Sequence, residues 1–213
     1  MIIKAFSIMK KLVWFAFIFF NLHAIFAQIP PPLPVIDSSK ANNNKPVPAK
    51  HTDSLSTMLP SNDIIDNLSK AQTLSKFFNA IQVAGLTETF KSKGPVTLFV
   101  PDNQAFEKMS AGKLDTLFRP GHAPELVALI TYHAIAGRLT SRDIERQINS
   151  NHNLGTFTTI TGSKLTATID TNRNIVLIDE NGRRSMIKRF DIPQSNGILF
   201  VIDSVLIPKK KLL

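Results

Sequence analysis

The feature that most constrains the fold of this chain is a change of pattern near Asn151. Upstream of it, apolar residues recur at helical spacing, as at Ile64, Ile65 and Leu68. Downstream, the chain is rich in β-branched residues and is divided by turn dipeptides such as Asn181-Gly182 and Asn196-Gly197. Helices followed by hairpin-linked strands predict an α+β domain whose sheet is largely antiparallel.

The first half of the domain predicts several short helices. Ser61-Asn62-Asp63 is a helix-start sequence, and a second helix carrying Leu74, Phe77 and Ile81 should stop at Gly85. Further helices are predicted after Asp102 or Asn103, over residues 123–134 and after Ser141.

Strands are predicted over residues 96–100, 156–160, 164–169, 175–179 and 198–207. The first of these lies among the helices, so it must join the later strands in one sheet.

The N-terminal segment has the pattern of a secretory signal peptide. Lys4, Lys10 and Lys11 precede an unbroken apolar run over residues 12–20, and Ala27 is a small residue at the expected cleavage point. The alternative is an uncleaved anchor, but the apolar run is short for a membrane span of about 20 residues. We therefore predict a signal peptide over residues 1–27 and a secreted, periplasmic or cell-envelope protein of bacterial type.

The absence of cysteine excludes several classes of site. The chain contains no Cys, which rules out disulfides, thiolate metal sites, cysteine nucleophiles and a lipid-bearing N-terminal cysteine.

Residues 28–60 differ in composition from the downstream part of the chain. Ile29 is followed by three prolines, and Ser, Asn and Pro dominate the rest of the segment without apolar periodicity. This composition predicts a disordered, semi-stiff linker, and a ligand for a proline-binding module is the alternative. We expect the domain to span residues 61–209, followed by a basic and apolar tail over residues 210–213.

Positive charge gathers late in the chain, although the net charge is +9 overall. The basic cluster comprises Arg183, Arg184, Lys188, Arg189 and Lys209-Lys210-Lys211. It is interpreted either as charge that protects a sheet edge or as a site for anionic polysaccharide, lipid headgroups or envelope polymers. We expect no nucleic-acid partner, because the protein is predicted to be exported and no aromatic platform accompanies the charges.

Patterns typical of catalysis are weak. No two of the residues His51, His122, His133 and His152 have metal-ligand helical spacing. Gly162-Ser163 lacks the flanks of a nucleophile elbow, and Asp179 and Glu180, as adjacent strand residues, should point to opposite faces. We therefore predict no catalytic residue, cofactor or metal. A hydrolase whose Ser, His and Asp meet only in the fold is the alternative.

Three segments together resemble one known family. Val96-Thr97-Leu98-Phe99-Val100-Pro101-Asp102-Asn103-Gln104-Ala105-Phe106 resembles the first signature of the fasciclin (fasciclin I-type) domain, and residues 191–208, from Asp191-Ile192-Pro193 to Ile207-Pro208, resemble its closing signature. Tyr132-His133 lies between them, as in the family. Phe200 stands where the family usually has His, which suits a core position.

The resemblance implies a fold and a role. The fold is a wedge or β-sandwich of about seven strands with helices on one side, and the role is adhesion or binding outside the cell without catalysis. In the family, the Asp-Ile pair, here Asp191-Ile192, is associated with adhesion, and the region of Tyr132-His133 is linked to receptor binding in animals. Each pair also has a structural interpretation: Tyr132 and His133 as buried, hydrogen-bonded residues, and Asp191 as a turn acceptor paired with a nearby Arg.

The sequence therefore predicts an exported, non-enzymatic adhesion or ligand-binding module. The expected partner is a protein or polysaccharide of the envelope or matrix, and the expected state is a monomer. A purely structural spacer is a further alternative.

Overall fold

Helices precede most of the sheet in the computed structural model of the chain, which describes residues 58–92, 94–110 and 112–209. The predicted signal peptide, most of the predicted linker and the tail lie outside these residues. The helices are α1 (Ile64–Leu68), α2 (Ser75–Val83), α3 (Thr87–Ser92), α4 (Asn103–Glu107), α5 (Lys113–Leu117), α6 (Ala123–Tyr132) and α7 (Ser141–Ser150). The strands are β1 (Val96–Pro101), β2 (Ala134–Ala136), β3 (Gly155–Thr158), β4 (Lys164–Ile169), β5 (Ile175–Ile178), β6 (Arg184–Gln194) and β7 (Gly197–Ile202).

The predicted helix starts are confirmed by their caps. The Asp63 carboxylate accepts a hydrogen bond from the Asp66 N–H at 2.8 Å, and the Asp102 carboxylate accepts one from the Ala105 N–H at the same distance. Each carboxylate thereby satisfies an N–H group that the helix itself leaves unpaired. Gly85, with a φ of 69°, follows α2 as predicted.

One seven-stranded sheet has the order β2-β1-β7-β6-β5-β4-β3. The early strand β1 joins the later strands as predicted, but it pairs with β7 in parallel, whereas every other neighbour is antiparallel. Just beyond β3, the Ile160 N–H donates to the Ala134 carbonyl of β2 at 2.8 Å. The two edges of the sheet therefore meet at one point, and the sheet is nearly closed.

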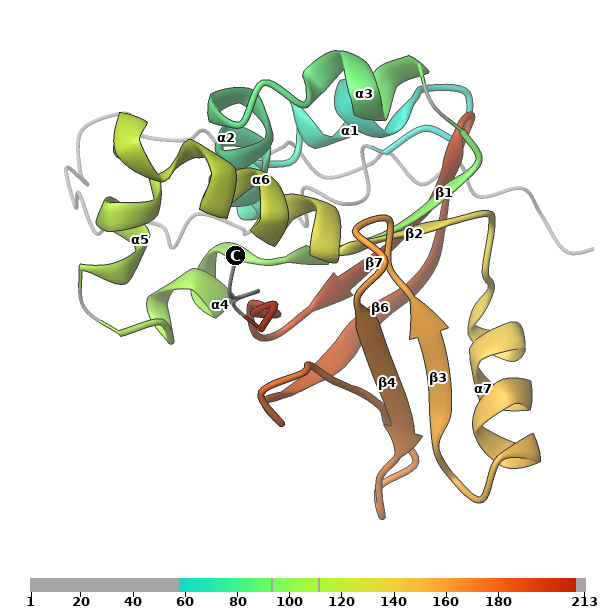
Figure 1. The fold of residues 1–213 in the computed structure, drawn as a ribbon. Coiled ribbons are helices and arrows are strands. Elements are labelled where there is room, and N and C mark those ends of the chain that lie inside the picture. The colour runs from blue at the N-terminus through green and yellow to red at the C-terminus, as the bar shows by residue number, and fades with distance from the viewer. Residues whose placement is uncertain (1–57, 93, 111, 210–213) are drawn as a thin grey trace, which may run out of the picture. The chain divides into compact units, whose positions relative to one another are not determined.

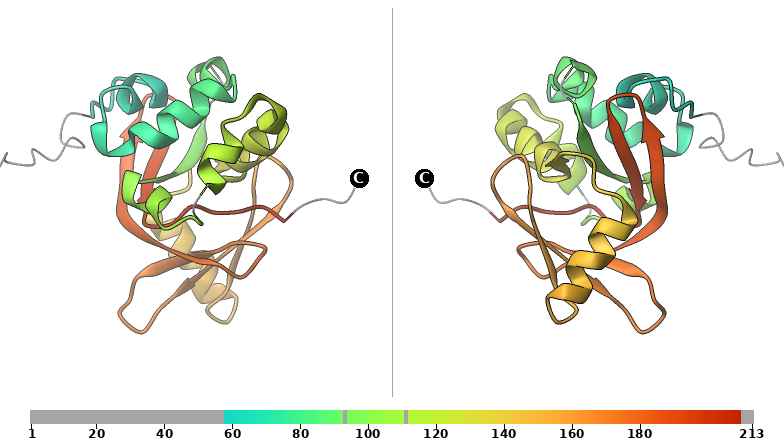
Figure 2. Two further views of the ribbon diagram at one scale, coloured as in Figure 1. Left: turned by 90° about the vertical axis from the view of Figure 1, so that its left-hand side faces the viewer. Right: turned by 90° about the vertical axis from the view of Figure 1, so that its right-hand side faces the viewer.

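Two hydrophobic clusters lie on opposite faces of β1 and β7. Leu98 and Val201 pack among residues of the helices, whereas Phe99 and Phe200 pack with Ile144 and other residues on the far face. The helices α1, α2, α3 and α6 gather at one side of the domain, and α7 lies beside β3 at the other (Figures 1 and 2). The predicted α+β fasciclin-like wedge is confirmed.

Some boundaries differ from prediction. The segment over residues 123–134 ends as a helix at Tyr132, and β2 follows at once. The closing strand ends at Ile202, and the chain then continues without regular structure. Asp179 and Glu180, expected in a strand, lie just after the end of β5.

Two described residues that precede the predicted start of the domain at residue 61 contact its helices. Leu59 donates its N–H to the Asn67 side chain at 3.0 Å and accepts from the same amide at 2.8 Å, and Met58 packs against the helical cluster. The buried amide of Asn67 needs polar partners, and the backbone before residue 61 supplies them. Met58 and Leu59, at the end of the predicted linker, therefore contact the domain.

Candidate functional site: strand β6 and the pocket beside helix α6

His133, at the end of α6, is fully buried and bonded at both ring nitrogens. Nδ1 contacts the Leu129 carbonyl at 2.8 Å, and Nε2 contacts the Leu206 N–H at 3.1 Å. Because a carbonyl only accepts and an N–H only donates, the ring is neutral and carries its proton on Nδ1. Burial lowers the pKa of His133 to about 4, although the bond to Leu129 favours the charged form.

Tyr132 is equally buried and bridges two parts of the sheet. Its hydroxyl donates to the Lys164 carbonyl at 2.8 Å and accepts from the Glu180 N–H at 3.1 Å. Burial raises the pKa of Tyr132 well above its ordinary value. The buried, hydrogen-bonded interpretation of Tyr132 and His133 is confirmed, and neither side chain can contact a partner in this fold.

Strand β6 is irregular where Asp191 and Ile192 lie. Its pairing with β7 shifts register between Ile187 and Arg189 and again between Arg189 and Ile192. Asp191 has a φ of 53°, a left-handed conformation that is uncommon for a residue other than glycine. The interpretation of Asp191 as a turn residue is wrong: Asp191 and Ile192 belong to a bulged strand, and both residues are only partly exposed.

Asp191 is held by the N-terminus of α7. Its carboxylate accepts from the Ser141 N–H at 2.8 Å and from the Ser141 hydroxyl at 2.5 Å. The expected pairing with an arginine is not found among the ion pairs of the described part of the chain. Ile192 packs against the helical cluster. The two bulges bring the side chains of Lys188, Arg189 and Phe190 to the surface.

Phe190 was not predicted from the sequence as a surface residue. It is 42% exposed, although it lies in a strand, and its ring meets Phe200 edge-on with centroids 6.3 Å apart. Lys188, Arg189, Phe190 and Ile192 line a shallow hollow, which we call the β6 surface. Phe190 is a single apolar residue between the charged residues Arg189 and Asp191, so it belongs to no alternating pattern. The alternation rule for strands therefore could not predict that its side chain is exposed.

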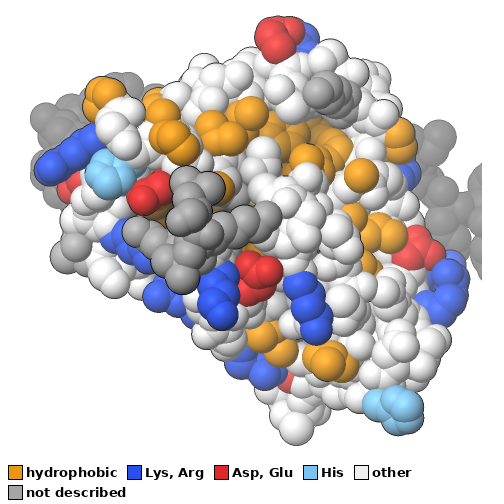
Figure 3. Space-filling view, in the orientation of Figure 1, with side chains coloured by type: hydrophobic (Ala, Val, Ile, Leu, Met, Phe, Trp, Pro, Cys, Tyr) orange, Lys and Arg blue, Asp and Glu red, His pale blue; other side chains and the backbone are white. Residues whose placement is uncertain are grey.

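The predicted basic cluster is divided. Lys188 forms an ion pair with Asp102 at 2.6 Å, whereas Arg183 and Arg184 are exposed at the opposite end of β6. On the face drawn in Figure 3, Lys and Arg side chains are scattered, whereas hydrophobic side chains form a band along α6.

A second concave site, the α6 pocket, holds about 510 Å³. Much of its lining is apolar: Leu117 comes from α5, Pro124, Ala128 and Leu129 come from α6, and Ile207 and Pro208 come from the segment after β7. Leu117 and Leu129 are also members of the helical core cluster. The pocket therefore opens directly onto the core.

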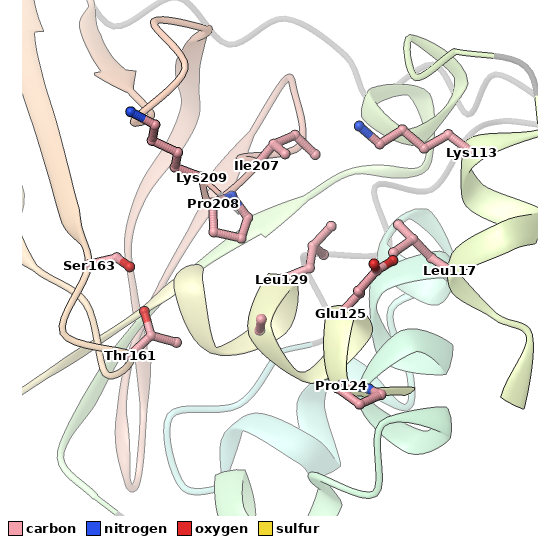
Figure 4. A pocket seen from close by; sticks show the side chains of 11 residues that line it. Lys113, Leu117, Pro124, Glu125, Leu129, Thr161, Ser163, Ile207, Pro208 and Lys209 are labelled. Atoms are coloured by element: carbon pink, nitrogen blue, oxygen red, sulfur yellow. The ribbon is translucent and has the colours of Figure 1, made fainter. Parts of the chain in front are cut away.

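The polar groups of the α6 pocket lie on two sides (Figure 4). Lys209 and Ser163 lie on one side, and Lys113 and Glu125 lie on the other. The Glu125 carboxylate contacts the His122 ring at 2.9 Å. Thr161 also lines the pocket, and its hydroxyl is bonded to that of Thr159 at 2.7 Å.

Other acidic and metal-binding possibilities are limited in the described ranges. Asp179 accepts from the N–H groups of Asn181, Arg183 and Ile207, each at 2.9 Å, so its oxygens stabilise a turn. No group of three or more metal-ligating side chains occurs among the residues that the structure describes. Within the same residues, no helix has the length and apolar character needed to span a bilayer.

A nearly closed sheet, a helical layer on one side and a buried Tyr-His pair together define a known class of domain. The chain belongs to the fasciclin domain family, whose model matches residues 72–208. It is 28% identical to the protein sll1483 of Synechocystis over 68% of this chain and 73% of that protein. It is 30% identical to the transforming growth factor-beta-induced protein ig-h3 of Oryctolagus cuniculus over 70% of this chain and 20% of that protein.

A solved structure shares the fold. It is the domain pair from the insect cell adhesion molecule fasciclin I, with a TM-score of 0.61 and 17% identity, and the match covers 68% of this chain and 51% of that chain. The chain thus spans about half of that structure and a fifth of the rabbit protein.

Proposed function

We propose that the protein is an exported, non-enzymatic module that adheres to a protein or polysaccharide of the cell envelope or matrix through the β6 surface. The observation that carries the proposal is the exposed ring of Phe190 in a hollow that Lys188 and Arg189 also line, on a strand distorted by two bulges. The cell-adhesion role in the name of the similar insect protein supports the same class of function.

The chemistry of the β6 surface suits a partner contact. Aromatic and arginine side chains contribute most often to the energetic centres of interfaces. Bulges commonly redirect side chains where a sheet performs a function. Asp191, fixed by Ser141, holds the bulge in place, so the surface is formed before any partner arrives.

Two observations favour binding over hydrolysis. Both ring nitrogens of His133 are bonded to the backbone, so this residue is not placed to act as a general base. Asp179 is engaged by three backbone N–H groups. A simple spacer, in turn, gives no reason for an exposed Phe190 beside a hollow.

Substitution of Phe190 tests the proposed contact. The full chain with Phe190→Ser should lose about tenfold in affinity, because a hot-spot residue contributes more than about 1.4 kcal/mol. The probes are immobilised peptidoglycan, alginate as an anionic polysaccharide and collagen as a matrix protein. Val83→Ser is the control, since Val83 is 49% exposed on α2 and lies outside the β6 surface.

We expect at least one probe to bind the wild type and the control equally. Both variants should stay folded, and Phe190→Ser should lose about 1 kcal/mol of stability at most from its contact with Phe200. The proposal would be contradicted if the wild type bound none of the probes, or if Phe190→Ser bound a probe as tightly as the wild type does.

The response to salt should be weak. Lys188 is already paired with Asp102, so an apolar contact at Phe190 rather than long-range charge should dominate. The affinity of the same probe should change by less than about threefold between low and high salt. A steep fall that Arg183→Ala with Arg184→Ala removes would instead assign binding to the divided basic cluster.

Export has its own test. Trp14 is the only Trp of the chain and lies in the predicted signal peptide. Protein recovered from outside a bacterial host should therefore show tyrosine emission without tryptophan emission. Tryptophan emission from the exported protein would show that the segment is retained as an anchor.

A further inference from the structure

The α6 pocket has the composition of a ligand site rather than of a packing defect. Its volume of about 510 Å³ lies in the range of small-molecule sites, which are mostly apolar with a few placed polar groups. Leu117 and Leu129 form an apolar wall that continues into the core. Such a wall gains free energy by covering an aliphatic chain.

Ser163 supplies a polar group directed into the pocket. The residue is only 6% exposed, and its hydroxyl points toward the cavity (Figure 4). The Ser163 carbonyl accepts from the N–H and the hydroxyl of Thr159, which holds the residue in place on the pocket wall. Polar groups placed on the wall of a mostly apolar pocket orient a ligand there, so a ligand atom at this point can form a hydrogen bond with the Ser163 hydroxyl.

Charge selects the kind of head group. Lys209 lies on the same side as Ser163 (Figure 4), and none of the ion pairs among the described residues involves Lys209 or Lys113. Glu180 lies nearby, but its two oxygens accept from the backbone N–H groups of Lys164 and Lys209. Glu125 is on the far side, in contact with His122. Because Lys209 lines the pocket and Glu180 does not, the Ser163 side presents a positive charge to a ligand and favours an anion.

We propose that the α6 pocket binds a free, single-chain anionic amphiphile, with its aliphatic chain along α6 and its carboxylate or equivalent group at Ser163 and Lys209. The pocket shares no lining residue with the β6 surface. Ligand binding in the α6 pocket is therefore a second function, and its test can fail or succeed independently of the proposed adhesion.

Calorimetric titration of the full chain tests this assignment. Dodecanoate, kept below its micelle concentration, should bind, and dodecyltrimethylammonium should bind at least about tenfold more weakly. Ala128→Phe should abolish binding because Ala128 lines the pocket from α6. Ala123→Phe is the matched control, since this exposed residue of the same helix does not line the pocket.

Charge reversal gives an independent arm that does not alter packing. Lys209→Glu should weaken dodecanoate binding about tenfold, whereas Lys70→Glu, which changes an exposed residue away from the pocket, should not. Vesicles of phosphatidylglycerol distinguish a free ligand from a membrane surface. The proposal is overturned by no binding of dodecanoate, by equal binding of the two head groups, or by binding that Ala128→Phe leaves intact. Vesicle binding that also survives Ala128→Phe would assign the basic residues to a membrane surface instead.

Discussion

At the scale of single residues, His133 links the helical layer to the end of the domain. Its ring receives the Leu206 N–H and donates to Leu129, and it also packs against Phe77 with ring centroids 5.3 Å apart. Protonation would place a second ring N–H against the Leu206 N–H, where no acceptor exists. The fold therefore depends on a neutral imidazole.

This dependence predicts a loss of stability in mild acid. The pKa of His133 is about 4 in the fold and 6.5 for an unperturbed histidine, so the unfolded chain takes up the proton first as the pH falls. The free energy of unfolding should be fully retained above about pH 6.5 and should fall by about 3 kcal/mol as the pH approaches 4. Urea midpoints measured across this range provide the check.

A variant and a control isolate the contribution of His133 to the acid response. His133→Gln should be less stable at pH 7 but should lose the slope between about pH 6.5 and 4. His152→Asn, at an exposed position with a φ of 53°, should keep the slope. Asp203 does not contribute to the slope in this pH range. Burial alone would raise the pKa of its carboxyl, but the Met186 N–H and Lys108 lower that pKa below its ordinary value. The stability that depends on ionised Asp203 is therefore lost only at lower pH. An unchanged slope in His133→Gln would refute the assignment.

At the scale of elements, β6 shows why the sequence could place Asp191 and Ile192 only in part. The family signature locates the pair just before the closing strand, and Pro193 with Asn196-Gly197 favours a turn. The bulges depend on Ser141, which is 50 residues away in sequence. No local pattern contains such a contact, so the turn prediction failed although the segment was identified.

The contact predicts an unusual order of substitutions at Asp191. Asp191→Asn should cost least because it keeps an acceptor for Ser141 and tolerates positive φ. Asp191→Gly loses the acceptor but fits the backbone, whereas Asp191→Ala loses both. We expect Ala to cost about 2–3 kcal/mol and to be about 1 kcal/mol worse than Gly. Thermal melting of the three variants is the measurement, and Ala as the mildest change would contradict the contact.

Gly197, which the sequence predicts as a turn residue, must be glycine for a second reason, which is packing. A Cβ at this position would lie 2.1 Å from the Val96 carbonyl oxygen, because β1 and β7 pair closely in parallel at this point. The Asn-Gly signal located the turn to within one residue, since Ser195 and Asn196 form it and Gly197 already begins β7. The close approach of β1 could not be predicted, since no local pattern indicates that the pairing is parallel.

At the scale of the whole molecule, the fold class was predictable and the surfaces were not. The α+β order, the caps of α1 and α4, and the burial of Tyr132 and His133 follow from local patterns and from three family segments. The α6 pocket depends on how α5, α6 and the segment after β7 meet, and the β6 surface depends on the contact between Asp191 and Ser141. Those contacts arise between elements remote in sequence, and exposed residues such as Phe190 are not constrained by periodicity.

The central strands also predict how the domain unfolds. Leu98 and Phe99 are adjacent in β1 but belong to the two clusters on opposite faces, and both are at most 1% exposed. Leu98→Ala and Phe99→Ala should each lower the free energy of unfolding by about 2–5 kcal/mol; Val201→Ala and Ile202→Ala test the same two faces from β7. Because β1 and β7 serve both clusters, each variant should show one transition in which helical circular dichroism and Tyr132 emission, read in a Trp14→Phe background, change together. If the circular dichroism and the Tyr132 emission of Phe99→Ala changed at different denaturant concentrations, while those of Leu98→Ala changed together, the two clusters would be independent folding units. If neither variant changed the unfolding midpoint, β1 would not be the strand that both clusters share.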